Sequence, residues 1–138
     1  MIPPLPDGCV GLLATLDASG PAVVPVSALH RTSPRRLLFA LAPHRGSLAR
    51  LRGDPRTALA LLGPGMALTV HGRSAVVADP LPGAPFVVAL ALEADRVTDT
   101  AGARTLVLDG VRWAWRDAAS AGRHVQVLAA LAAHAAAA

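Results

Sequence analysis

Apolar and polar residues alternate along the first part of the chain in short runs, with turn sequences between them. The run 10–17 (VGLLATLD) is followed by the turn sequence ASGP and by a second apolar run, 22–31 (AVVPVSALHR). Glycine and proline together favour a reversal, so the pattern predicts a β-hairpin over residues 10–31. Pro25 lacks the backbone N–H that a central strand donates, which indicates an edge strand or a bulge.

Further segments have the pattern of strands and are separated by proline and glycine. They are residues 35–42, 56–62, 66–79 and 86–97, the last with a nearly continuous apolar start typical of a buried strand. Strict alternation in the third of them puts Thr69, His71 and Arg73 on one face. The segments 106–108 and 111–115 fit either two strands of a hairpin or one bent strand.

Two segments predict helices. Residues 47–52 lie between breakers and start with Ser47, a residue type that caps helix N-termini. Residues 117–134 are rich in alanine, with Leu128 and Leu131 near helical spacing. Short strands joined by tight turns, with a small helix after the third and another at the end, predict a mainly β barrel.

Composition narrows the class of protein. Of 138 residues, 53% are apolar but only four are aromatic, which predicts one domain over residues 1–138 with a core of alanine, valine and leucine. We find no signal peptide and no apolar run long enough for a membrane span, so we expect a cytoplasmic protein without a membrane partner. The single cysteine, Cys9, excludes an internal disulfide, and a buried structural role is favoured over that of a nucleophile.

The net charge of +4 comes from arginine, because the chain has no lysine. These arginines are dispersed, and no aromatic residue lies between Phe39 and Phe86 to act as a stacking platform, so nucleic acid is disfavoured as a partner. The five histidines stand singly, without a second ligand at metal-binding spacing, and no metal site is predicted.

One candidate anion site surrounds the start of the first predicted helix. Arg45, Gly46 and Ser47 combine a guanidinium, a small residue and a hydroxyl at a helix N-terminus, a combination that can hold a phosphate, with Arg50 one turn further on. The alternative is a solvated arginine face on a surface helix. The spacing alone favours the solvated face.

Two further groups leave alternatives open. Thr69, His71 and Arg73 either face water or line a ligand cleft, because they cannot enter an apolar core without partners. Trp113 and Trp115 share a strand face in a chain with few aromatic residues. They fit an interface, a planar ligand site, or a local apolar plug beneath the last helix.

The order of these segments resembles a known family. Three segments carry the resemblance, in the order VGLLATLDASGPAVVPVSALH, RRLLFALAPHRGSLARLRGDPRTALALL and GMALTVHGRSAVVADP. Over roughly residues 8–80 they are similar to the FMN-binding split barrel of the pyridoxamine 5'-phosphate oxidase-like superfamily. The resemblance implies a six-stranded antiparallel split β-barrel with a short helix after the third strand and a C-terminal helix. It also implies a homodimer with FMN sites along the subunit interface.

The same resemblance implies a set of cofactor-binding residues: Arg45, Ser47, Arg50, Val26, Ser27, Ala28, Thr69, His71 and Trp113. Aligned from Asp54, Arg45 and Ser47 fall at the family's phosphate-binding positions, and Ser47 replaces the usual lysine. The second strand would lie near the isoalloxazine ring, the strand with Thr69 and His71 would edge the cleft, and Trp113 would come from the partner subunit.

The implied function is that of an FMN-dependent oxidoreductase that transfers a hydride or electrons to or from a small-molecule substrate. The sequence names neither the substrate nor a catalytic residue. The alternative is a non-catalytic member that binds a flavin, a deazaflavin or haem weakly, or no cofactor. The loss of the lysine at Ser47 favours this alternative.

Overall fold

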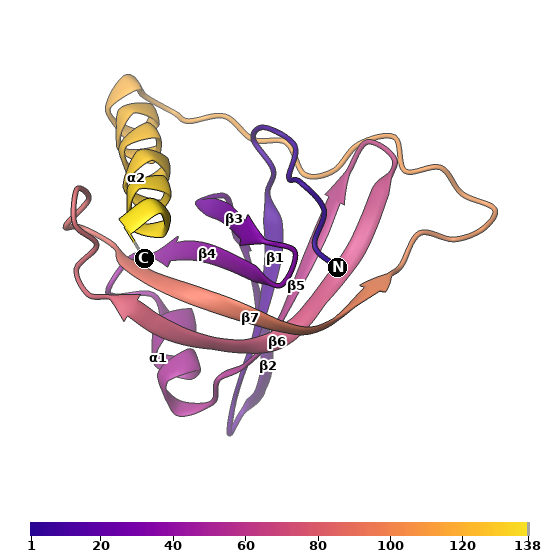
Figure 1. Ribbon diagram of the computed structural model, residues 1–138, viewed down its shortest axis with the longest axis horizontal. Helices are drawn as coiled ribbons and strands as arrows, with labels where there is room; N and C mark the ends of the chain where they lie inside the picture. Colours follow the sequence, from indigo (N-terminus) through magenta and orange to yellow (C-terminus); the bar gives the residue numbers. More distant parts are fainter. Residues whose placement is uncertain (138) are drawn as a thin grey trace.

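One strongly curved antiparallel sheet dominates the computed structural model, which describes residues 1–137 (Figure 1). Its strands are β1 (Gly11–Asp17), β2 (Gly20–Val26), β3 (Leu29–Ser33), β4 (Arg36–Leu41), β5 (Arg56–Gly63), β6 (Met66–Ala78) and β7 (Val88–Asp99). They lie in the order β2-β1-β5-β6-β7-β4-β3. Helix α1 (Gly46–Gly53) follows β4, and α2 (Ala118–Ala137) ends the chain. The mainly β fold with two helices is as predicted.

The sheet has seven strands and not six, because the predicted strand over residues 22–31 is two strands. Ser27 and Ala28 leave the strand conformation after β2, and β3 then pairs with β4 at the opposite edge of the sheet. The backbone N–H of Leu29 donates to the Ser27 carbonyl at 3.0 Å, and that of Ala40 donates to Ala28 at 3.1 Å. The chain thus crosses from one edge to the other within two residues, which requires the two edges to lie close together.

Pro25 lies in β2, which pairs only with β1 and is an edge strand as predicted. In β6 the predicted alternation holds: Val70 is buried, His71 is half-buried on the other face and Arg73 is exposed. The first five residues of β7 are all buried, as the continuous apolar run indicates.

The strands predicted at 106–108 and 111–115 are absent, since residues 100–117 contain neither helix nor strand. The backbone N–H of Gly65 donates to the Val107 carbonyl at 2.8 Å, and Gly110 lies directly against the Leu62 carbonyl. Leu106 and Leu108 remain 75% and 80% exposed. The segment therefore contacts the end of the β5–β6 hairpin without forming a strand.

The core has two parts on the two sides of the sheet. The larger part fills the inside of the curve with leucine and valine from all seven strands and from α1. The smaller part lies where Val127, Ala130 and Leu131 of α2 pack against β4 and β7. Neither helix of residues 1–137 is long and apolar enough to cross a membrane. Helix α2 lies beside β3 and β4, as Figure 1 shows.

The pairing of β6 with β7 depends on one glycine. The register shifts between His71 and Gly72, so that Asp95 has no partner in the ladder. A Cβ on Gly72 would collide with the backbone carbonyl of Glu93, which cannot move without breaking the sheet. Only glycine fits at this β-bulge.

We predict that Gly72→Ala destabilises the fold by roughly 1–3 kcal/mol, the usual cost of overpacking a closed site. Chemical denaturation followed by circular dichroism measures the change in the free energy of unfolding. Gly122→Ala in α2 is the matched control: apart from the helix's own neighbouring backbone, no atom lies within 4 Å of its Cβ position, and alanine favours helix. Equal stability of the two variants would contradict the role of Gly72.

Candidate functional site

A cavity of about 350 Å³ lies where residues 113–115 and helix α2 pass over the link between β2 and β3. We call it the indole pocket. The residues that line it are Pro25, Val26, Ser27, Ala28, Ala40, Ala42, Arg45, Phe86, Val87, Trp113, Trp115, Ser120, Arg123, His124 and Val127. Small side chains from β4 and the β2–β3 link leave flat backbone surface on one side of it. Its size and its mixture of apolar walls with a few polar groups are typical of small-molecule sites.

Three ring systems make one wall of the indole pocket. The rings of Trp113 and Trp115 lie 6.1 Å apart at 55°, and those of Trp115 and His124 lie 4.8 Å apart at 36°. Burial lowers the pKa of His124, so its imidazole stays neutral at pH 7 and packs as an aromatic ring. This wall presents aromatic surface to a ligand without adding a charge.

Positive charge enters the indole pocket from two elements. Arg45 is the N-cap residue of α1, whose first turn has no acidic residue and no side-chain cap. Arg123 comes from α2. The N–H groups at the start of a helix carry partial positive charge, so the N-cap position of Arg45 adds to the positive field of its guanidinium.

Ser47 and Arg50 are placed elsewhere. Ser47 is buried inside the first turn of α1, not at its N-cap as predicted, and its hydroxyl accepts a hydrogen bond from Arg50 Nη2 at 3.3 Å. Arg50 Nε donates to Thr15 Oγ1 at 2.8 Å. A side chain on Gly46 would meet the Arg50 guanidinium, so glycine leaves room for it. The Arg50 side chain thus reaches β1, and neither Ser47 nor Arg50 lines the indole pocket.

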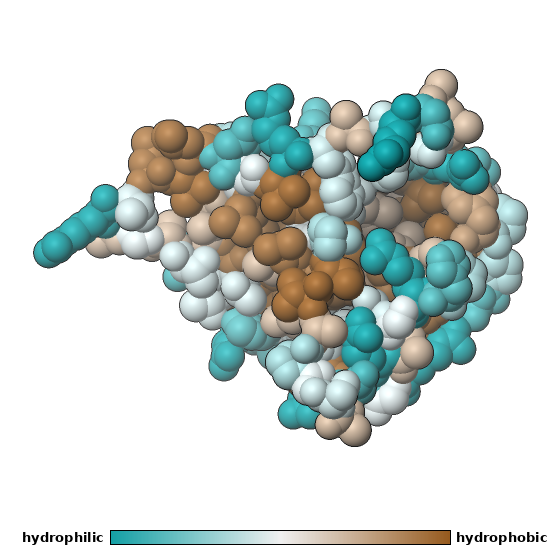
Figure 2. Space-filling model, turned by 180° about the vertical axis from the view of Figure 1, so that it is seen from behind, coloured by the Kyte–Doolittle hydropathy of each residue, from teal (hydrophilic) through white to brown (hydrophobic). Residues whose placement is uncertain are grey.

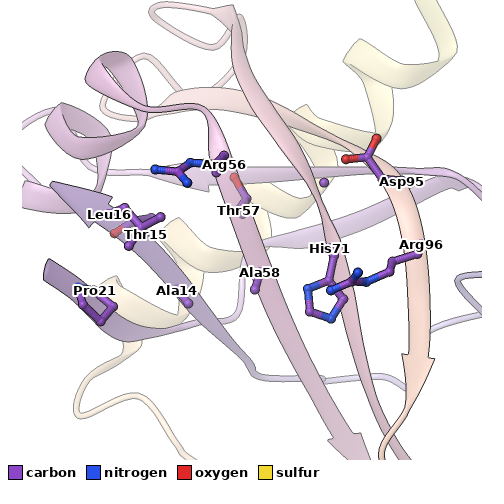
Figure 3. Close-up of a pocket in the computed structure, with 11 residues that line it drawn as sticks. Ala14, Thr15, Leu16, Pro21, Arg56, Thr57, Ala58, His71, Asp95 and Arg96 are labelled. Atoms are coloured by element: carbon purple, nitrogen blue, oxygen red, sulfur yellow. The ribbon is translucent and has the colours of Figure 1, made fainter.

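Thr69 and His71 lie on the outer face of the sheet. His71 lines a second cavity of about 400 Å³, the outer-face cavity, with residues of β1, β2, β5 and β7. Figure 3 shows the Arg96 side chain beside His71, its register partner, while Asp95 points away. Thr69 lies between Ala60 and Thr98 in the same sheet. A single chain therefore does not bring Thr69 or His71 to the indole pocket.

The outer face of β1, β2 and β5 is apolar. In register across these strands, side chains directed away from the core belong to Leu12, Ala14, Leu16, Val23, Pro25, Ala58 and Ala60. Val23 is 60% exposed. Seen from behind, apolar surface gathers over the middle of the molecule (Figure 2). We call the surface formed by these seven outward-facing side chains the apolar face.

Of the nine predicted cofactor residues, the structure brings five together in the indole pocket: Val26, Ser27, Ala28, Arg45 and Trp113. Arg123 and His124 also line the indole pocket, and the sequence pattern did not predict them. Their signal was a polar pair in a helix made mostly of alanine, which also fits a solvated helix face. Their role depends on where α2 packs, and no local pattern gives that position.

No family model and no curated protein matches this sequence. Solved structures do match. A candidate pyridoxamine 5'-phosphate oxidase from Lactobacillus delbrueckii is 20% identical with a TM-score of 0.58, over 67% of this chain and 84% of that one. One from Listeria innocua is 13% identical with a TM-score of 0.56, over 66% and 87%. An F420 reductase is 16% identical with a TM-score of 0.58, over 66% and 90%.

At these identities the likeness concerns the fold. These solved structures have the fold that the sequence resemblance implies. They match about two thirds of this chain. The resemblance is thereby confirmed: this chain has the split-barrel fold of the pyridoxamine 5'-phosphate oxidase-like proteins.

Proposed function

We propose that this chain binds FMN in the indole pocket and acts as a homodimeric flavin-dependent oxidoreductase on a small-molecule substrate. The observation that carries the proposal is the combination, in one cavity, of Arg45, the N-cap residue of α1, with a wall of aromatic rings. The names of similar structures support a flavin-type cofactor: one is an F420 reductase and another an FAD-binding protein from Mesorhizobium loti.

The residues of the indole pocket fit the parts of FMN. Ala28, Ala40 and Ala42 leave a flat surface for a planar ring, and the Ser27 hydroxyl can donate to a ring heteroatom. Arg45 and the first N–H groups of α1 suit the phosphate. The bound flavin would supply hydride or electron transfer. The role of Trp113, Trp115 and Phe86 is to exclude water from it.

A second copy of the chain would bring Thr69 and His71, which lie outside the indole pocket of their own chain, to a cofactor site. The apolar face is a surface that a soluble protein tends to bury, and His71 and Thr69 lie beside it on β6. In a homodimer that buries this face, Thr69 and His71 of one subunit approach the cofactor site of the other. Two-fold symmetry then gives two equivalent sites.

The alternative is a non-catalytic member that holds a flavin, a deazaflavin or haem weakly. One observation favours it: Ser47, at the position of the family's phosphate-binding lysine, is buried and hydrogen-bonded to Arg50. No cation at that position therefore replaces the lysine, and Arg45 carries the phosphate site with the helix N-terminus. The affinity for FMN distinguishes the flavin-dependent oxidoreductase from the non-catalytic member.

We predict that purified protein loaded with FMN keeps a yellow flavin absorption band through gel filtration. Arg45→Ala should then weaken FMN binding about tenfold or more, the cost of one charge-assisted hydrogen bond, while riboflavin binding changes little. Flavin fluorescence titration measures both affinities. Arg52→Ala is the control, because Arg52 lies on the same helix but pairs with Asp79 on the surface. Equal losses for FMN and riboflavin would remove the phosphate role of Arg45.

We also predict that Val23→Glu converts a dimer into monomers, since a carboxylate in the middle of a buried apolar face loses its hydration. Light scattering after size-exclusion chromatography gives the mass. Val125→Glu in α2 is the matched control: Val125 is 65% exposed and lies away from the apolar face. A wild-type monomer, or a Val23→Glu dimer, would refute this interface.

A further inference from the structure

A third cavity, of about 340 Å³, lies between the N-terminal segment 4–9, strand β3 and helix α2. We call it the N-terminal cavity. Its polar lining residues are Asp7, Ser27, His30, Arg31 and His124, with the thiol of Cys9. Two of these, Ser27 and His124, also line the indole pocket. The two cavities are therefore neighbours, and the same two side chains form their boundary.

Arg31 is the residue of the N-terminal cavity that indicates a ligand. It is half-buried, and its Nε donates to the Ile2 carbonyl at 2.8 Å. The ion pairs found within residues 1–137 do not include Arg31. A guanidinium has five N–H donors, so the others remain for a ligand. A half-buried cation without a counter-ion is stabilised by an anion that binds beside it.

The other groups of the cavity do not supply that counter-ion. Burial raises the pKa of the Cys9 thiol, which keeps it protonated and uncharged at pH 7. Asp7 lines the cavity but is itself exposed, and its carboxylate lies beyond ion-pair distance of Arg31. The positive charge of Arg31 is thus left for a ligand, with Asp7 as a negative charge at the rim.

We propose that the N-terminal cavity binds a small organic anion, with its carboxylate or phosphate group at Arg31 and its uncharged end toward Ser27 and His124. Because these two residues border the indole pocket, the uncharged end lies next to the proposed cofactor. The anion is then the substrate of the proposed oxidoreductase, and this part of the inference rests on the proposed function. The anion site itself rests on Arg31 and the cavity alone.

The test uses the full chain and three probes of similar size. Benzoate carries a carboxylate, phenyl phosphate carries a phosphate, and benzamide is uncharged. Isothermal titration calorimetry should detect at least one of the two anions and much weaker binding of benzamide. The preferred anion identifies the headgroup. Equal binding of benzamide would overturn the proposal, because the charge at Arg31 would then play no part.

Two variants locate the binding. Arg31→Gln keeps an N–H donor for the Ile2 carbonyl but removes the charge, and should weaken the anion about tenfold, as expected for a charge-assisted hydrogen bond. Asp7→Asn, at an exposed position, should strengthen it by removing a like charge. The second variant decides if the first does not fold. Unchanged anion affinity in the variants that fold would overturn the site.

A flavin readout separates this inference from the proposed function. If the anion changes the absorption spectrum of bound FMN in the wild type but not in Arg31→Gln, the substrate site is supported. If FMN binds and the anion leaves its spectrum unchanged, the substrate role is refuted while the cofactor proposal stands. If FMN does not bind but the anion still depends on Arg31, the proposed function falls and the anion site remains.

Discussion

The link between β2 and β3 is the constraint on which the rest of this structure depends. These strands lie at opposite ends of the sheet order, yet only Ser27 and Ala28 separate them. Three steps of extended chain span about 10 Å at most. The sheet must therefore curl until its first and last strands nearly meet. Flattening the sheet would break the chain's own connectivity, so the curvature is a covalent requirement as well as a result of core packing.

The same constraint positions the candidate sites. A seam between two strand edges leaves backbone groups that the sheet does not pair, and side chains that point into neither the core nor the solvent. Ser27, in this seam, lines both the indole pocket and the N-terminal cavity. Helix α2 covers the seam from outside and adds His124 to both. Both cavities thus exist because the barrel is closed by a link of the chain and not by a strand pair.

The sequence predicted those features that depend on neighbouring residues. The faces of β6, the buried start of β7, the edge position of Pro25 and both helices follow from local periodicity and from the chemistry of proline and alanine. The division of residues 22–31 did not follow, because the apolar run continues through Ser27 and Ala28, and a local pattern does not reveal the edge to which a strand belongs. Residues 106–115 have an apolar pattern like that of a strand, but they contact the end of the β5–β6 hairpin and join no edge of the sheet.

The residues predicted to bind phosphate illustrate the same limit at the level of single side chains. The resemblance to the family places Arg45 and Ser47 at its phosphate-binding positions, with Arg50 close by in the same short segment. Once the segment is a helix, residues three apart share a face, so Arg50 donates hydrogen bonds both to Ser47 and to Thr15. Arg45, one residue before the helix, is the member of the three that lines the indole pocket. Because the helix starts directly after Arg45, residues that are close in sequence have different partners. Which of them can bind a ligand therefore depends on the helix geometry and not on the sequence motif.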